Sequence, residues 1–118
     1  MALLNLSMDW GESYEISLKT SNYLDSDKLA IAMEYYDTDY KDFMPYSILT
    51  VNLVGQKVDK DCAFVDTNNL GEKIIKWIED NNLGAPTGRY ARSGFCAYPE
   101  VRFNLDEVKK YCRKNTEE

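Results

Sequence analysis

The feature that most constrains the fold is the alternation of apolar and polar residues in the first half of the chain. Tyr14, Ile16 and Leu18 alternate with serine, glutamate and lysine, and a period of two residues is typical of a β-strand with one buried face. Three further segments read as strands in the same way: residues 4–8, residues 29–36 and residues 46–53. The first half therefore predicts four strands in a mainly antiparallel sheet, joined by short polar connections.

The second half changes to a helical period. Asn69 followed by Glu72, and Asn104 followed by Glu107, have the spacing of a capping box. In that motif each side chain satisfies a backbone amide at the start of a helix. We expect one helix to follow the cap at Asn69 and end near residues 81–84, and a second helix to follow Asn104 and place Tyr111 and Cys112 on its inner face.

The segment between these helices divides into a loop and a strand. Residues 84–94 hold three of the six glycines, which indicates a loop. Residues 95–103 read as a strand in which Pro99 indicates an edge or a bulge. The expected order β-β-β-β-α-β-α is an α+β fold, with a mainly antiparallel sheet of about five strands and two helices packed on one face. We expect residues 1–118 to form a single domain.

Acidic residues dominate the chain and gather in its first half. The net charge is −6 at pH 7, and residues 1–66 hold 12 Asp and Glu against five Lys. Nucleic-acid backbones are bound by clustered Lys and Arg, so we expect no direct binding of nucleic acid. No segment approaches the roughly 18 apolar residues that span a bilayer, so we expect no membrane contact.

The available side chains exclude several kinds of site. The chain has no histidine and three separated cysteines, Cys62, Cys96 and Cys112. Histidine-based general bases, Cys–His pairs and Cys₂His₂ zinc sites are therefore excluded, and the glycine-rich nucleotide motifs are absent. We expect neither an enzyme nor a cofactor. An odd number of cysteines without a CxxC pair is typical of free, buried thiols in a cytoplasmic protein.

An acidic and aromatic segment between the third and fourth strands is the first candidate site. Tyrosine is common at protein interfaces, and negative charge steers association with basic surfaces. We therefore expect a protein partner, such as a nucleic-acid-binding effector; the alternative is a solvated hairpin tip without a binding role. The segment fits a calcium-binding loop of the EF-hand type poorly, because it lacks the glycine at the sixth position and the glutamate at the twelfth position that such a loop requires. The candidate residues are Glu34, Tyr35, Tyr36, Asp37, Asp39, Tyr40 and Asp42.

The glycine-rich loop is the second candidate site. Arg89 and Arg92, between Gly88 and Gly94, would offer guanidinium groups and backbone amides to an anion. The alternative is that both arginines pair with carboxylates of the same molecule. This loop is the basis of a second hypothesis, a protein that binds a small anionic ligand or a peptide.

Two longer stretches carry a family resemblance. They are Cys62-Ala-Phe-Val-Asp-Thr-Asn-Asn69 and Leu83-Gly-Ala-Pro-Thr-Gly-Arg89, continued by residues 93–104. Together they resemble a family of small bacterial proteins, number 4313 in the domain-of-unknown-function series, over roughly residues 46–112. Proteins of this family are typical of plasmids, conjugative elements and phages of Gram-positive bacteria, and no catalytic residue is carried over from them.

The resemblance changes the functional expectation. Small acidic proteins of mobile elements often inhibit host defence nucleases, of the CRISPR or the restriction type. The first hypothesis is therefore an accessory protein of a mobile element that occupies a basic nucleic-acid groove on such a nuclease. The ligand-binding hypothesis stands beside it, and the strand order and oligomeric state stay open at this level.

Overall fold

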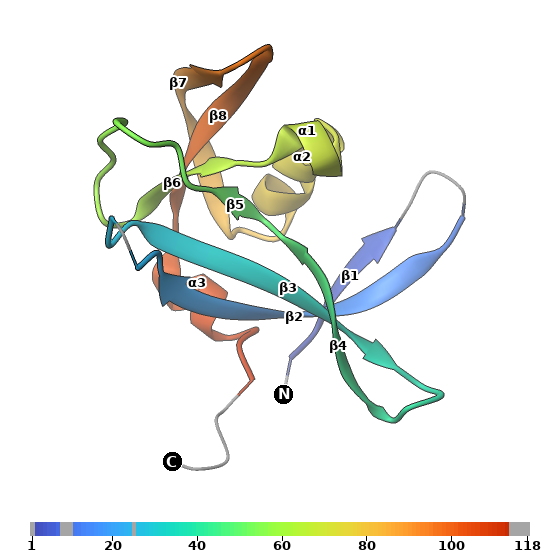
Figure 1. Cartoon of the computed structure of the whole chain (residues 1–118). Helices are drawn as coiled ribbons and strands as arrows, with labels where there is room; N and C mark the ends of the chain where they lie inside the picture. Colours follow the sequence, from blue (N-terminus) through green and yellow to red (C-terminus); the bar gives the residue numbers. More distant parts are fainter. Residues whose placement is uncertain (1, 8–10, 25, 114–118) are drawn as a thin grey trace.

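The computed structural model describes residues 2–7, 11–24 and 26–113 (Figure 1). Met8, which the alternation assigns to the first strand, lies outside these residues. The described strands form two four-stranded antiparallel sheets. The first sheet has the order β1 (Leu4–Ser7), β2 (Ser13–Asn22), β3 (Leu29–Asp37) and β4 (Asp42–Ile48). The second has the order β5 (Thr50–Val51), β6 (Cys62–Val65), β8 (Cys96–Phe103) and β7 (Gly84–Ser93).

The predicted single sheet of about five strands with two helices on one face is wrong. The error lies in the second half, where the predicted loop of residues 84–94 is nearly all strand β7. Its glycines serve a bulge and a turn, because the pairing of β7 with β8 shifts register between Pro86 and Tyr90. Gly94 adopts a φ of 62° where the hairpin reverses. Strand β6 was also missed, since its four residues are all buried and show no alternation.

The two sheets are joined at Leu49, where the predicted fourth strand breaks in two. The Leu49 amide donates to the carbonyl of Ile31 in the first sheet at 2.8 Å, and its carbonyl accepts from the Asp66 amide at 3.0 Å. The next residue, Thr50, accepts the Ile31 amide on its hydroxyl at 3.1 Å. β4 and β5 consequently belong to different sheets.

One apolar core is shared by both sheets and the helices. Ile16 and Leu18, which the alternation assigns to the inner face, are fully buried there. Burying an aliphatic side chain of this size contributes roughly 1.5–3 kcal/mol. The inward-facing strand pattern is thus confirmed for β2 and β3. The other large members of this core are Leu4, Leu6, Leu29, Ile31, Met33, Leu49, Val65, Ile74, Ile78, Leu83, Val101, Phe103 and Val108.

Three short helices follow β6 and β8. They are α1 (Thr67–Leu70), α2 (Lys73–Asp80) and α3 (Leu105–Lys109). The predicted cap at Asn104 is confirmed, since its side chain accepts the Glu107 amide at 3.3 Å. The predicted cap at Asn69 is wrong, because Asp66 is the cap and accepts the Asn69 amide at 3.2 Å. Of the described helices, none is both long and apolar enough to cross a membrane.

The chain beyond α3 runs along the edge of β2. The second predicted helix was expected to include Tyr111 and Cys112, but α3 ends at Lys109, and Cys112 forms a parallel bridge with Leu18. β1 pairs only with residues 13–16 of β2, and this segment bonds to β2 just beyond them, at Leu18. We call residues 111–113 the C-terminal strap.

Candidate functional site

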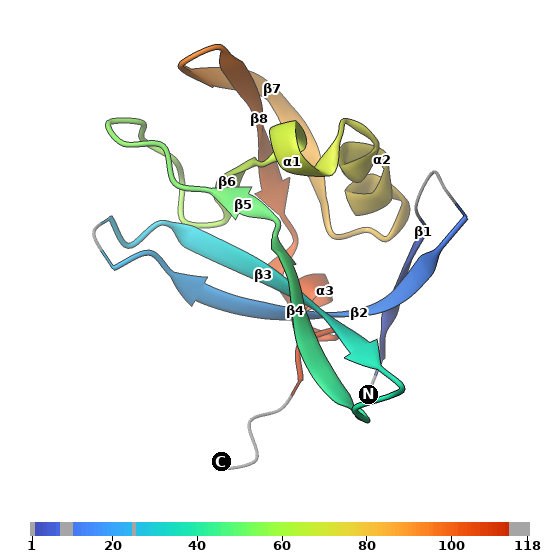
Figure 2. The ribbon, with the colours of Figure 1, turned by 45° about the vertical axis from the view of Figure 1, so that its right-hand side comes forward.

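The acidic segment lies at the tip of the β3–β4 hairpin. Asp37 and Asp42 are the last paired residues of the two strands, so the predicted connection of residues 37–45 is shorter than expected. The tip projects away from the helices in both views (Figures 1 and 2). We call residues 37–42 the acidic knuckle.

The side chain of Asp37 fixes the backbone of the knuckle. Its Oδ1 accepts the amides of Asp39 at 2.8 Å and Tyr40 at 3.1 Å, which is an Asx turn. Lys41 completes the reversal with a φ of 55°, and Asp42 accepts the amide of the next residue at 2.8 Å. The turn is therefore closed by its own aspartates, which leaves the Asp39 carboxylate directed to solvent and Tyr40 74% exposed.

The seven predicted site residues are divided between the two faces of the first sheet. Tyr35 packs inward, with ring centroids 5.4 Å from Tyr14 and 6.3 Å from Tyr46. Burial raises the pKa of both of these neighbouring tyrosines. Glu34 and Tyr36 alternate with Tyr35 and lie on the opposite face. The structure thus assigns Tyr35 to the core and keeps the other predicted residues at or near the knuckle.

An arginine that sequence reasoning missed lies at the base of the knuckle. Arg113 donates through Nε and Nη2 to Oε1 of Glu34, at 3.1 and 2.7 Å. Its Cζ lies 4.4 Å from the ring centroid of Phe43, and Phe43 in turn contacts Tyr36 edge-on at 5.3 Å. Glu34 and Arg113 are 79 residues apart in sequence, so no local pattern signals the pair.

Residues 17–118 match the family described as Domain of unknown function (DUF4313). The chain belongs to this family. The match confirms the predicted resemblance and extends it from residue 46 back to β2, so that the DUF4313 region includes both the knuckle and the strap. The search of curated proteins and the search of solved structures gave no match.

In the DUF4313 chain, Arg89 of the second predicted site is held by contacts with other residues of the same molecule. Arg89 donates through Nη1 to Oε2 of Glu100 and to the carbonyl of Lys57, both at 2.7 Å. Its Nη2 donates to the side chain of Gln56 at 3.3 Å, and the guanidinium lies 5.3 Å from the Phe64 ring centroid. These contacts favour an intramolecular role for Arg89.

Arg92 is placed differently. Its side chain is exposed and makes no hydrogen bond or ion pair with the described part of the chain, although its backbone pairs with Ala97 of β8. Arg89 lies over the Phe64 ring, on the side where Ala91 is buried, and Arg92 directly follows Ala91 in the strand, so the side chains of Arg89 and Arg92 lie on opposite faces of β7. Gly88 and Gly94 adopt φ values of 91° and 62°, which glycine adopts without strain. The structure therefore does not bring the two arginines together around one anion.

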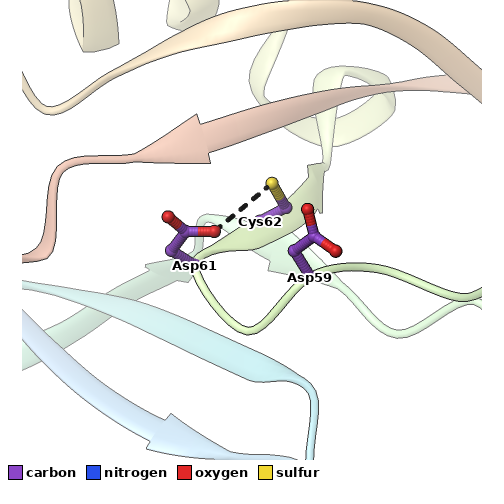
Figure 3. A group of neighbouring side chains, drawn as sticks. All are labelled: Asp59, Asp61 and Cys62. Atoms are coloured by element: carbon purple, nitrogen blue, oxygen red, sulfur yellow. Dashed lines mark hydrogen bonds between the residues drawn. The ribbon is translucent and has the colours of Figure 1, made fainter.

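A third cluster contains Asp59, Asp61 and Cys62 (Figure 3). Their ligand atoms lie within 4.8 Å of one another, at the edge of an open hollow of about 990 Å³. Arg102 pairs with both carboxylates, donating to Asp61 at 2.6 Å and to Asp59 at 2.8 Å. Burial raises the pKa of the Cys62 thiol to about 11, which keeps it protonated at neutral pH. The cluster of the DUF4313 chain is thus arranged around a guanidinium, and its thiol is a poor metal ligand.

Proposed function

We propose that this DUF4313 protein acts by binding a basic surface of another protein, with the acidic knuckle as the contact. The observation that carries the proposal is the fixed, projecting turn in which Asp39 and Tyr40 are exposed. A preformed contact loses little conformational entropy on binding. Exposed carboxylates also raise the association rate with a positive surface, and tyrosine supplies buried area at an interface.

The finer part of the proposal concerns the nature of that surface. We propose that it is a nucleic-acid groove, in which the carboxylates of Asp37, Asp39 and Asp42 take the place of phosphates. The net charge of −6 supports this, because a groove built for nucleic acid attracts an acidic protein over a long range. The protein would then be an accessory protein of a mobile element that inhibits a host defence nuclease of the CRISPR or the restriction type, by binding and not by catalysis.

The test replaces the three knuckle aspartates by asparagine. Asparagine retains the Oδ1 acceptor on which the turn depends, so Asp37→Asn, Asp39→Asn and Asp42→Asn remove charge without removing these hydrogen bonds. A matched control carries three asparagine substitutions elsewhere on the surface, at Asp27, Asp80 and Asp106. Both triple variants have the same net charge, so a difference between them reports the position of the charges.

The protein and both variants are used to capture partners from a Gram-positive host, and the captured protein is then bound in vitro. We expect the knuckle variant to bind at least about tenfold more weakly at low salt, with most of the difference lost at high salt because exposed charges are screened. A short oligonucleotide is expected to compete with the wild-type protein. Equal binding by the knuckle variant and the wild type would contradict the proposed contact, and a lack of competition would contradict the groove.

A further inference from the structure

The C-terminal strap is anchored on the first sheet before it reaches the hairpin. The carbonyl of Tyr111 accepts the amide of Leu18 at 2.9 Å and the hydroxyl of Ser17 at 3.2 Å. Ser17 is fully buried, although it belongs to the face opposite the core. The position of Tyr111, two residues before Arg113, is therefore set by bonds to β2.

The hairpin extends beyond the strand that supports it. β2 pairs with β3 only as far as Tyr35, whereas β3 and β4 stay paired as far as Asp37 and Asp42. The last part of the hairpin is thus two-stranded, and two-stranded hairpins are only marginally stable without further packing. The knuckle needs support from outside its own two strands.

Arg113 contacts both strands of the hairpin where the pairing with β2 ends: Glu34 still pairs with Ser17, whereas Phe43 lies opposite Tyr36 in the two-stranded part. It holds Glu34 of β3 by two hydrogen bonds and lies over the ring of Phe43 of β4. The Glu34 side chain is 19% exposed and that of Arg113 is 37% exposed. Partial burial strengthens a charge pair and a cation–π contact relative to fully exposed ones. The Phe43 ring in turn contacts the ring of Tyr36, the residue that precedes the knuckle. Arg113 therefore supports Tyr36 indirectly, through Phe43.

We propose that Arg113 is a positioning residue that holds the acidic knuckle in its binding conformation. Arg113 itself lies at the base and the carboxylates lie at the tip, so it acts through Glu34 and Phe43 and not by touching the partner. This inference rests on the proposed function of the knuckle. It adds that binding depends on a side chain from the other end of the DUF4313 region.

The first test measures the order of the knuckle directly. In the full chain, Arg113→Gln removes the charge and the guanidinium fork, and Arg113→Lys keeps the charge alone. We expect the backbone order parameters of Asp39 and Tyr40 to fall from about 0.85 to below about 0.6 in Arg113→Gln, with an intermediate value in Arg113→Lys. Arg102→Gln is the matched control, because Arg102 also donates two hydrogen bonds to carboxylate oxygens but belongs to the second sheet. Unchanged order parameters in Arg113→Gln would overturn the proposal.

The second test uses a basic peptide of ten alternating arginine and lysine residues as the probe. Arg113→Gln changes the net charge from −6 to −7, so general electrostatics alone would strengthen peptide binding. A positioning role predicts the opposite, a loss of about fivefold in affinity as the knuckle becomes mobile. Binding as tight as wild type, or tighter, would overturn the proposal.

The two proposals fail in different ways. If the triple asparagine variant of the knuckle binds the peptide as wild type does, the knuckle is not the contact and the proposed function fails. The order parameters still decide whether Arg113 positions the hairpin. If the triple variant loses binding and Arg113→Gln does not, the knuckle is the contact but Arg113 is not its positioning residue.

Discussion

Arg89 and Glu100 form an ion pair across the β7–β8 hairpin, with Nη1 and Oε2 2.7 Å apart and the carboxylate only 8% exposed. The second carboxylate oxygen accepts the hydroxyl of Thr87 at 2.7 Å. A buried carboxylate is costly unless such partners compensate for its lost hydration. The bulge between Pro86 and Tyr90 is the segment that brings both partners to Glu100, so Gly88 within this segment serves the ion pair.

The first prediction is that Arg89→Ala destabilises the fold. The substitution leaves Glu100 buried with one neutral partner, and we expect the free energy of unfolding to fall by about 2 kcal/mol. Arg92→Ala is the matched control and is expected to change it by less than about 0.5 kcal/mol, because Arg92 is exposed and unpaired in the described structure. Urea denaturation of both variants measures this, and equal midpoints would contradict the structural role of Arg89.

The strands were predictable where apolar and polar residues alternate along a single strand, because this pattern arises within the strand itself. Ile16 and Leu18 face the shared apolar core, whereas Ser17 between them is buried on the opposite face against the C-terminal strap, so an apolar core on one face only produces the period of two residues directly. The family was also predictable, because residues 62–69 and residues 83–89 with 93–104 resemble it.

Contacts between distant segments could not be predicted in the same way. Residues 84–94 contain glycines because a bulge and a tight turn need them, but the same residues also suit an irregular loop. The alternation correctly separates Glu34 from Tyr35, yet nothing in either segment indicates that Arg113 meets Glu34. The break at Leu49 depends on hydrogen bonds to Ile31 and Asp66, which no local sequence pattern records.

The second prediction separates the structural role of Asp37 from its charge. Asp37→Ala removes the acceptor of two backbone amides, so we expect a loss of about 1 kcal/mol in the free energy of unfolding. Asp37→Asn keeps that acceptor and is expected to cost less than about 0.5 kcal/mol. Thermal denaturation of both variants at one pH is the measurement. A loss of similar size in the two would mean that the charge, and not the turn, stabilises the hairpin.

The third prediction concerns pH. Burial raises the pKa of Cys62 from its ordinary value of 9.0 to about 11 in the folded protein, so between pH 9 and 11 the folded state binds more protons than the unfolded state. The free energy of unfolding therefore falls as pH rises through this window, by up to roughly 2 kcal/mol from this thiol. Below pH 9 the contribution is fully present.

Cys62→Ala isolates this effect. Burial also raises the pKa of Tyr14 and Tyr46, so their contribution to the fall is common to both proteins. We expect the slope of unfolding free energy against pH to be smaller in Cys62→Ala than in wild type, measured by urea denaturation at pH 8, 9, 10 and 11. Equal slopes would show that the thiol does not titrate differently in the folded chain.

The fourth prediction is that Arg102 excludes divalent cations from the cluster of Asp59, Asp61 and Cys62. The guanidinium satisfies both carboxylates, so millimolar Ca²⁺, Mn²⁺ or Zn²⁺ is expected to leave the melting temperature of the wild type unchanged. Arg102→Ala leaves two carboxylates close together without a cation, so we expect added metal to raise its melting temperature by mass action. A metal-dependent rise in the wild type would contradict the assignment of the cluster to Arg102.

The last prediction concerns the start of β7. A methyl group added at Gly84 would lie 2.6 Å from the carbonyl oxygen of Arg102 and 2.9 Å from Cγ1 of Val101, both on the paired strand β8. Gly84→Ala must therefore push the two strands apart, and we expect a loss of about 2 kcal/mol in the free energy of unfolding.

Gly88→Ala provides the comparison for this position. Its added methyl group would meet no atom within 4 Å, but its φ of 91° disfavours a side chain by about 1 kcal/mol. We expect the urea midpoints to fall in the order wild type, Gly88→Ala, Gly84→Ala. The reverse order of the two variants would mean that backbone conformation in the bulge, and not the close approach of β7 to β8, is the tighter constraint on this hairpin.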